Sequence, residues 1–294
     1  MKRLIVIMCF GLYFSNVYAQ TNTASPEQLP AKIVHNNDDD SPTATVFTYS
    51  RTPLQDAIRQ INDEYGWAIN SEDAPTVNAL EMVDDNADFR RSHPGLWEGY
   101  SPNGHPFHST FKESRTHHAE VVTVIEQLLQ DYNASTNPGR YSLERTAQNG
   151  YVIIGTKYKS ESGAELAFTP PLSCPITLTI STMSLHDAFQ LIAKQVNETC
   201  KTNLNADTAT ALLGQIENSI VSGTYNREPA RDVIEELLLQ QRLLLYYSVD
   251  YVPGLNVYYL ATWIVRETIT GADGNQVRRP VINKKFVDTV EHPF

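Results

Sequence analysis

Five histidines are the first residues to consider for metal chemistry: His93, His105, His108, His117 and His118. His105 and His108 have a His-x-x-His spacing, which on a helix would put two imidazoles on nearby faces. Gly104 and Pro106 favour a loop at this point. A third ligand would have to be an acid, namely Asp84, Asp85 or Glu113. We expect solvated loop histidines with no metal ion and no cofactor, and metal binding is the alternative.

Two pairs of neighbouring carboxylates, Glu72-Asp73 and Asp84-Asp85, raise the question of acid-base chemistry. Glycosidase chemistry needs two carboxyl groups that face each other across a cleft. Adjacent positions in a sequence do not establish such a geometry. We therefore expect both pairs to lie on the surface.

Ser184, His186 and Asp187 have the residue types of a catalytic triad, but residues this close in sequence cannot form one. Ser184 and Asp187 suit a helix N-cap and an acidic first turn. The sequence also contains no nucleophile elbow, phosphate loop or dinucleotide fingerprint. These patterns indicate no catalytic residues, and we expect a protein that is not an enzyme.

The N-terminus has the pattern of an export signal. Lys2 and Arg3 precede an apolar run over residues 4–14, and Val17-Tyr18-Ala19 offers a cleavage site after Ala19. The alternative is an uncleaved anchor, but 11 apolar residues are too few for a span of about 20. We expect a signal peptide over 1–19, no transmembrane segment after its removal, a disordered leader over 20–43, and a periplasmic or extracellular location.

Cys174 and Cys200 are the two cysteines outside this signal. Exported chains meet an oxidising compartment, where a pair of cysteines more often forms a bridge. A disulfide between them would close a loop of about 26 residues and stabilise the fold by about 3 kcal/mol. Two buried thiols are the alternative.

The composition is that of a globular protein. The 294 residues include 23 Lys and Arg against 34 Asp and Glu, a formal net charge of -11. Binding to nucleic acid requires a basic face, so we expect no nucleic-acid partner. The length suggests about two domains.

Hydrophobic periodicity predicts the same order of elements twice. The first copy has a strand at 45–49, a helix from Thr52 to Tyr65 ended by Gly66, a strand at 67–69, a helix over 118–132, and a hairpin at 140–145 and 151–155. Thr52 and Gln55 suit a capping box. The second copy has a strand at 176–180, a helix over 184–196, strands near 202–204 and 219–225, a helix from Pro229, and a hairpin at 243–249 and 257–264.

Two matched helices indicate an internal repeat. Residues 54–58 correspond to 185–189, an offset of 131, and residues 124–129 correspond to 233–238, an offset of 109. We expect an α+β fold of two tandem β-α-β-β-α-β-β modules, with helices on one face of a small mixed sheet. Module 1 covers 44–157 with an insertion at about 79–113, a linker covers 158–173, module 2 covers 174–264, and a C-terminal hairpin or tail covers 265–294.

The stretch 45–70, TVFTYSRTPLQDAIRQINDEYGWAIN, resembles the secretin and TonB short N-terminal domain, abbreviated STN. That family has a strand, a Pro-Leu-x-x-Ala-Leu-like helix start, a glycine before a short strand, and a second helix that ends in Leu-Leu before a hairpin. The matching positions are Pro53, Leu54, Ala57, Ile58, Gly66, Leu128 and Leu129. The second copy keeps Leu185, Ala188, Phe189, Leu237 and Leu238, and has Asn197-Glu198 where the glycine should lie.

Two further motifs are similar to those of uncharacterised secreted bacterial proteins. They are Tyr65-Gly66 followed by Glu72-Asp73-Ala74-Pro75, and the run from Asn226 to Val233, NREPARDV. STN modules precede an outer-membrane pore or receptor barrel and contact periplasmic proteins. This sequence contains no such barrel, so the resemblance implies a protein partner in the envelope and no transport role.

The insertion is rich in aromatic residues interleaved with Gly and Pro. Trp97, Tyr100, Phe107 and Phe111 are the candidate interaction loop, because aromatic side chains bury a large area at low entropic cost. The alternative is that they fold back as a satellite core. We expect an exported, non-enzymatic protein-interaction or envelope-associated protein. The alternative is a secreted hydrolase or metal-binding protein that uses the insertion. The partner, its ligands and the oligomeric state do not follow from the sequence.

Overall fold

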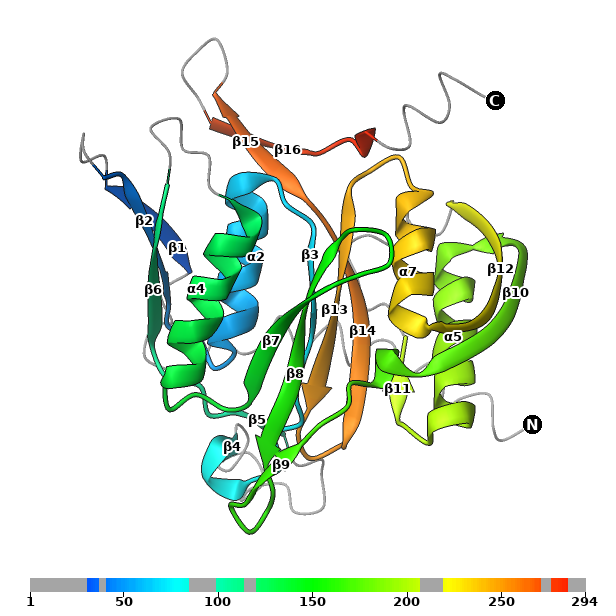
Figure 1. Cartoon of the computed structure of the whole chain (residues 1–294), viewed down its shortest axis with the longest axis horizontal. Coiled ribbons are helices and arrows are strands. Elements are labelled where there is room, and N and C mark those ends of the chain that lie inside the picture. The colour runs from blue at the N-terminus through cyan, green and yellow to red at the C-terminus, as the bar shows by residue number, and fades with distance from the viewer. Residues whose placement is uncertain are drawn as a thin grey trace, which may run out of the picture.

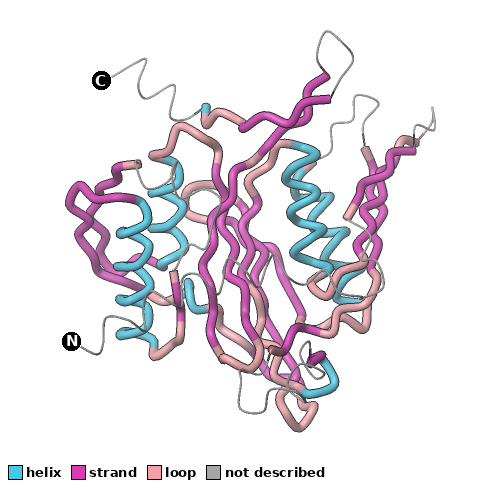
Figure 2. The backbone as a smooth tube through the Cα atoms, turned by 180° about the vertical axis from the view of Figure 1, so that it is seen from behind, coloured by secondary structure: helices cyan, strands magenta, loops and turns pink. Residues whose placement is uncertain are grey.

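The computed structural model describes residues 31–36, 41–84, 99–113, 120–206, 219–270 and 276–284. Over these residues the chain is a mixed α+β structure, as the sequence predicts. Figure 1 shows its layers side by side: a small sheet, two helices, a central sheet, two more helices and a second small sheet. Figure 2 shows the same order from behind.

The first pair of helices consists of α2 (Pro53–Tyr65) and α4 (Val121–Ala134). Gly66 ends α2 in the left-handed conformation with φ 66°, as predicted. The expected capping box is wrong, since Thr52 makes no side-chain cap hydrogen bond. Gln55 instead donates to the buried carboxylate of Asp73.

The small sheet of the first half has the order β1-β2-β6, with strands β1 (Lys32–Asn36), β2 (Thr43–Thr48) and β6 (Phe107–Lys112). Strand β1 corrects the expectation that residues 20–43 are a disordered leader. Ile33 packs against the core of the first half, and the Lys32 ammonium lies 5.8 Å above the Phe47 ring. The His35 ring bonds Glu113 at 2.9 Å. These contacts hold a short polar segment that has too few apolar residues to show a periodicity.

The remaining elements of the first half follow α2. They are β3 (Ile69–Glu72), the short helix η1 (Ala79–Glu81), β4 (Met82–Asp84), β5 (Tyr100–Pro102), β7 (Arg140–Arg145) and β8 (Tyr151–Lys159). The predicted linker 158–173 is also structured in part, because it contains β9 (Glu165–Ala167), which pairs with β8, and the short helix η2 (Pro171–Ser173).

The second half contains the second pair of helices, α5 (Leu185–Cys200) and α7 (Ala230–Leu239). Its strands are β10 (Pro175–Ser184), β11 (Leu204–Asn205), β12 (Ile220–Pro229), β13 (Leu245–Val252) and β14 (Val257–Ile264). Strands β10 and β12 form a two-stranded antiparallel sheet. Lys201 ends α5 in the left-handed conformation with φ 56°, so the counterpart of Gly66 is Lys201 and not the expected Asn197-Glu198. The reason is that α5 runs longer than α2.

One central sheet joins strands of both halves in the order β11-β14-β13-β3-β8-β7. Strand β13 pairs in parallel with β3 through Ser248 opposite Ser71 and Val249 opposite Glu72. Each helix pair therefore lies between a small sheet and the central sheet (Figure 1). This differs from the prediction of helices on one face of a separate small sheet, because the sequence did not reveal the pairing of β3 with β13.

Strand β8 separates two hydrophobic cores. Val152 and Ile154 point into the core around α5 and α7, whereas Ile153 points into the core around α2 and α4. Alternate residues of a strand face opposite sides of a sheet. The two helix pairs consequently cover opposite faces of the central sheet.

The C-terminal ribbon consists of β15 (Arg266–Thr270) and β16 (Gln276–Pro280), as the sequence predicts for this region. It contacts the body of the protein. The Arg278 guanidinium lies 2.8 Å from the Asp63 carboxylate of α2, and Val281 donates its N–H to the carbonyl of Val265 at 2.9 Å.

Candidate functional site

The histidines of the insertion do not form a metal centre in the part of the chain that the structure describes. His105 and His108 are both exposed, and His108 lies on the solvent face of β6, with its ring stacked on Phe47 at 6.0 Å. Among the described residues, no three His, Cys, Asp or Glu side chains gather as metal ligands. His93, His117 and His118 lie outside these residues.

Ser184 and Asp187 act as a helix cap, as predicted. The Ser184 Oγ accepts the backbone N–H of Asp187 at 3.0 Å and donates to the Asp187 carboxylate at 2.7 Å. His186 contacts Gln190 at 3.0 Å on the same helix. These contacts are local to the start of α5.

The candidate interaction loop is divided by the structure. Phe107 and Phe111 point inward from β6 and are 6% and 3% exposed. Their rings meet Tyr132 at 5.4 Å and Tyr65 at 6.2 Å, respectively. These two phenylalanines are core residues and do not offer a recognition surface. Tyr100 is half-buried in β5, and Trp97 lies outside the described residues.

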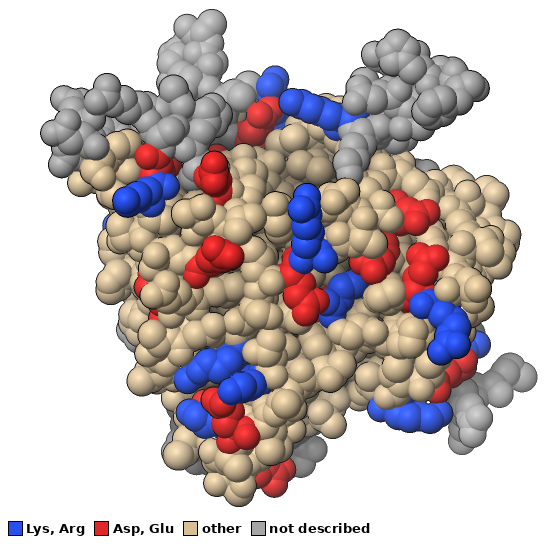
Figure 3. All heavy atoms as spheres, in the orientation of Figure 1, with Lys and Arg blue, Asp and Glu red and all other residues tan. Residues whose placement is uncertain are grey.

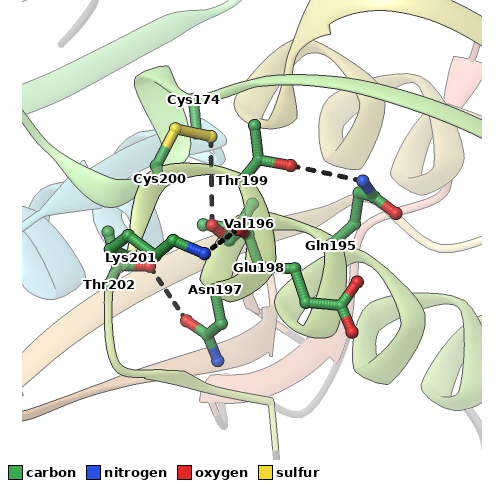
Figure 4. Close-up of a disulfide and its surroundings, with 9 residues drawn as sticks. All are labelled: Cys174, Gln195, Val196, Asn197, Glu198, Thr199, Cys200, Lys201 and Thr202. Atoms are coloured by element: carbon green, nitrogen blue, oxygen red, sulfur yellow. Dashed lines mark hydrogen bonds between the residues drawn. A yellow bond between two sulfur atoms is a disulfide. The ribbon is translucent and has the colours of Figure 1, made fainter.

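Cys174 and Cys200 form a disulfide, as the sequence predicts, with their Cα atoms 6.1 Å apart. Figure 4 shows that it ties the segment before β10 to the C-terminal end of α5. Cys174 is 4% exposed, and its carbonyl accepts the N–H of Ala230 at 2.9 Å. The bond therefore fixes the start of β10 against both helices of the second half.

A cleft of about 610 Å³ opens where the two halves meet. We call it the junction cleft, and its lining residues are Pro75, Val77, Tyr158, Ser160, Glu161, Ser162, Phe168, Asn256 and Tyr258. Strands β8, β3 and β13 run parallel to one another. Pro75 follows β3, Ser160 follows β8 and Asn256 follows β13. Ligands of open α/β sheets commonly bind at such carboxyl ends of parallel strands.

Aromatic rings from both halves form the walls of the junction cleft. Phe168 lies 6.1 Å from Tyr258 with nearly parallel rings, and 6.2 Å from Tyr158 in an edge-to-face arrangement. Tyr258 in turn packs on Tyr251 at 5.0 Å. Mutual packing holds these rings in place before any ligand arrives, which lowers the entropic cost of binding.

Two exposed leucines neighbour residues of the cleft, Leu166 by strand pairing and Leu80 through Asn78. Leu166 of β9 is 42% exposed and pairs with the wall residue Tyr158. Leu80 of η1 is 86% exposed, and the neighbouring Asn78 donates to the carbonyl of Ser160 at 2.8 Å. We call Leu80 and Leu166 the rim leucines. An apolar patch with a polar rim is typical of a protein-binding surface.

The charges around the cleft argue against an anionic ligand, because its lining contains Glu161 and no Lys, Arg or His. Figure 3 shows acidic and basic side chains interspersed over the face in view. The junction cleft therefore suits a neutral or apolar ligand group.

Glu72 and Asp73 are buried between the two halves, which corrects the expectation of a surface pair. Glu72 is fully buried, and its carboxylate lies 3.1 Å from the Nε of Arg231 and 3.2 Å from the hydroxyl of Tyr247. Arg231 also donates to Glu144 at 2.6 Å. The Nε contact is a close ion pair without an aligned hydrogen bond. Burial raises the pKa of Glu72 to about 7, although Arg231 acts in the opposite direction.

Asp73 lies next to this pair on the α2 side of the sheet. Its backbone N–H donates to Val249 at 2.8 Å, and its carboxylate accepts the N–H of Tyr251 at 3.4 Å. Burial raises the pKa of Asp73 well above its ordinary value, and the nearby Asp250 raises it further. These contacts connect β3 to β13 and to the tyrosines of the cleft, so the acids act as structural links.

Two of the sequence motifs meet at this ion pair, namely the one that contains Glu72-Asp73 and the run from Asn226 to Val233. Glu72 belongs to the first motif and Arg231 to the second, 159 residues apart. An acid in one motif and a base in the other was the signal in the sequence that could have indicated this contact between the halves, because a buried carboxylate needs a nearby cation. Nothing in the sequence indicated the junction cleft, whose wall residues come from four separate segments.

Comparisons with family models, with curated protein sequences and with solved structures find no match to this chain. In the described residues, no helix has both the length and the apolar character needed to cross a membrane.

Proposed function

We propose that this chain is an exported, non-enzymatic protein that binds a protein partner in the cell envelope, and that it consists of two STN-like modules fused through a common sheet. The junction cleft with its rim leucines is the proposed binding site. The observation that carries this proposal is that one cleft, lined by aromatic and polar side chains, takes residues from both halves.

Matched strand pairing supports the module arrangement. The strand before the first helix of each half pairs antiparallel with the strand before the second helix, in β2–β6 and in β10–β12. The short strand after the first helix pairs in parallel with the last strand of the half, in β3–β8 and in β11–β14. An antiparallel hairpin completes each half, in β7–β8 and in β13–β14.

A repeated asparagine contact gives further support. Asn62 of α2 donates to the carbonyl of Ile69 and accepts its N–H, both at 3.0 Å. Asn197 of α5 makes the same two hydrogen bonds with Leu204, both at 2.7 Å. We call these contacts the asparagine clamps. Each clamp joins the end of a helix to the first residue of the following strand.

A protein partner fits the cleft better than a small charged metabolite. Aromatic and large apolar residues are enriched at protein interfaces, and Leu80, at 86% exposed, is available for such a contact. A partner that inserts an apolar side chain between Tyr158 and Phe168 would also cover both rim leucines. The export signal predicted from the sequence supports a partner in the envelope.

Site-specific cross-linking in the producing cell tests the proposal. A photo-reactive phenylalanine at position 166 should give one discrete cross-linked protein, and the same group at exposed Val277 of β16 should give none. Leu80→Asp should abolish the cross-link at position 166. A cross-link of twice the chain's mass, or equal labelling at positions 166 and 277, would overturn the proposal.

A further inference from the structure

The two halves differ in how many strands cover their helices. In the first half, β1 adds to the edge of β2 through five residue pairs, from Lys32 opposite Phe47 to Asn36 opposite Thr43. In the second half, the corresponding strand is β10. Within the described residues, β12 is the only strand that pairs with β10. The outer edge of β10 thus occupies the position at which β1 binds in the first half.

Burial of matching residues shows the effect of the third strand. Ala44, Val46 and Thr48 point inward from β2 and are fully buried. The corresponding inward-pointing residues of β10 are Ile176, Leu178 and Ile180. Ile176 and Ile180 are buried, but Leu178 is only half-buried. Its counterpart Val46 is the residue that pairs with Ile33 of β1. A third strand beside β10 would cover Leu178 in the same way.

The side chains of β10 leave its edge unprotected. Edge strands are usually guarded by charged residues, especially Lys. Strand β1, the outer strand of the first half, carries Lys32 and His35. Strand β10 has the sequence PITLTISTMS, with no charged residue. The opposite edge, β12, carries Arg227 at φ 58° and Glu228. The edge open to pairing is therefore that of β10.

The acceptor stretch is short and already rigid. The pairing of β10 with β12 shifts register after Ile176, where the extra residue is Arg227 of β12, and after Ile180, where the extra residue belongs to β10. Only a bulge on β10 itself interrupts pairing with a further strand, so an added strand would pair with about five residues that end at Ile180. The disulfide between Cys174 and Cys200 anchors the start of β10 (Figure 4). A preformed edge reduces the entropic cost of adding a strand.

We propose that the edge of β10 binds an extended segment of a partner protein as a third, antiparallel strand, with an apolar side chain placed over Leu178. Main-chain hydrogen bonds would supply affinity, and the inward-facing side chain would supply specificity. This site lies on the small sheet beyond α5 and α7 (Figure 1), and the lining of the junction cleft contains no residue of β10. It is independent of the proposed binding at the cleft.

A peptide copied from this chain's own β1 is the probe. The peptide is residues 31–37, AKIVHNN, with blocked ends, and the protein is the mature chain with its disulfide intact. Titration followed by amide NMR shifts should move the signals of Thr177–Ile180. In one further peptide the backbone nitrogens of residues 32, 34 and 36 carry methyl groups, and in a second peptide those of residues 33 and 35 do. Since alternate N–H groups point to opposite sides of a strand, only one of the two should bind at least about tenfold more weakly.

Two variants complete the test. Leu178→Lys should weaken peptide binding at least about tenfold, because an inward-pointing charge protects an edge. Thr224→Lys, on the exposed side of β12, is the matched control and should bind normally. The proposal is overturned if both N-methylated peptides bind alike, if the shifts fall on β2, or if no shift of β10 occurs at millimolar peptide. Leu178→Lys should retain the cross-link at position 166, and Leu80→Asp should retain peptide binding, which separates the two proposals.

Discussion

The two halves of this molecule reach a similar layout by different means. The first half covers its helices with three strands, of which β1 is held by the contacts of Lys32 and His35. The second half has two covering strands and a disulfide at the start of β10. The first helix of the first half ends at a glycine, and that of the second half ends at Lys201. The comparison teaches that strand pairing and the asparagine clamps define the layout, while covalent and edge contacts are adapted separately in each half.

The largest expected effect concerns the link between the halves. Arg231→Ala removes the cation beside the buried Glu72, and breaking a buried ion pair costs about 3–5 kcal/mol. We expect this loss in urea unfolding monitored by tryptophan fluorescence. The exposed Arg145 provides the control, and Arg145→Ala should change the free energy of unfolding by less than about 0.5 kcal/mol. Equal effects of the two substitutions would show that the halves do not depend on this pair.

The second expected effect is on the pH dependence of stability. The raised pKa of Glu72, about 7 against an ordinary 4.5, means that the folded state binds this proton more tightly than the unfolded state. Stability is therefore fully present below about pH 4.5 and declines as the pH rises to about 7, by about 3 kcal/mol. The raised pKa of Asp73 acts in the same direction. Unfolding measured from pH 4.5 to 8 should show this decline, and Glu72→Gln should reduce it to the part that Asp73 contributes. A stability that rises over this range would contradict the assignment.

A third effect of similar size should be confined to the second half. Replacing Cys174 and Cys200 by Ala opens a loop of about 26 residues, with an expected loss of about 3 kcal/mol. Amide hydrogen exchange should increase in β10 and α5, while α2 and α4 keep their protection. Uniform loss of protection across both halves would mean that they unfold as one unit.

The asparagine clamps should differ in strength between the halves. Asn62 is fully buried, so Asn62→Ala leaves the N–H and C=O of Ile69 without their partner and should cost about 2–3 kcal/mol. Asn197 is only half-buried, and water can replace its side chain, so Asn197→Ala should cost about 1 kcal/mol. Thermal unfolding of the two variants measures the difference. A larger loss for Asn197→Ala would reverse the comparison.

The smallest effect concerns the residues that end α2 and α5. Gly66→Ala places a Cβ in the left-handed region, where no atom lies within 4 Å to clash with it, and should cost about 1 kcal/mol through the backbone alone. Lys201→Gly should relieve the same strain, offset by greater freedom of the unfolded chain, with a net change within about 0.5 kcal/mol. Chemical denaturation of both variants distinguishes these outcomes.

Local elements were predictable because their signals are local. Helix α2 with its terminal Gly66, the cap at Ser184 and the Cys174–Cys200 pair all follow from residue types within a few positions or from cysteine pairing rules. The fold class followed from the order of these elements. Strand β1 escaped because its position depends on hydrogen bonds of His35 to Glu64 of α2 and to Glu113, which follows β6, and both partners lie far along the chain.

The junction could not be predicted in the same way. The burial of Glu72 depends on β13, whose pairing with β3 joins residues about 177 positions apart. Such pairing leaves no periodic trace in a single sequence, and a Glu-Asp dipeptide ordinarily lies in solvent. The loop aromatics were misassigned for a related reason. Phe107 and Phe111 alternate with polar residues along β6, but the surrounding glycines and prolines indicated an irregular loop.

The direction of the central strands has a consequence for assembly. Strand β3 runs parallel to β13. Strand β14 runs antiparallel to β13, and β11 runs parallel to β14. A half-turn rotation about an axis that lies across the strands, combined with a translation along the sheet, therefore superimposes one half on the other. Repeating this operation never returns to the starting position, so its geometry allows further copies to be added without limit. In this chain Asn133 binds both the N–H and the C=O of Tyr141 in β7, the strand at one end of the sheet, so these two main-chain groups are not available to a further strand.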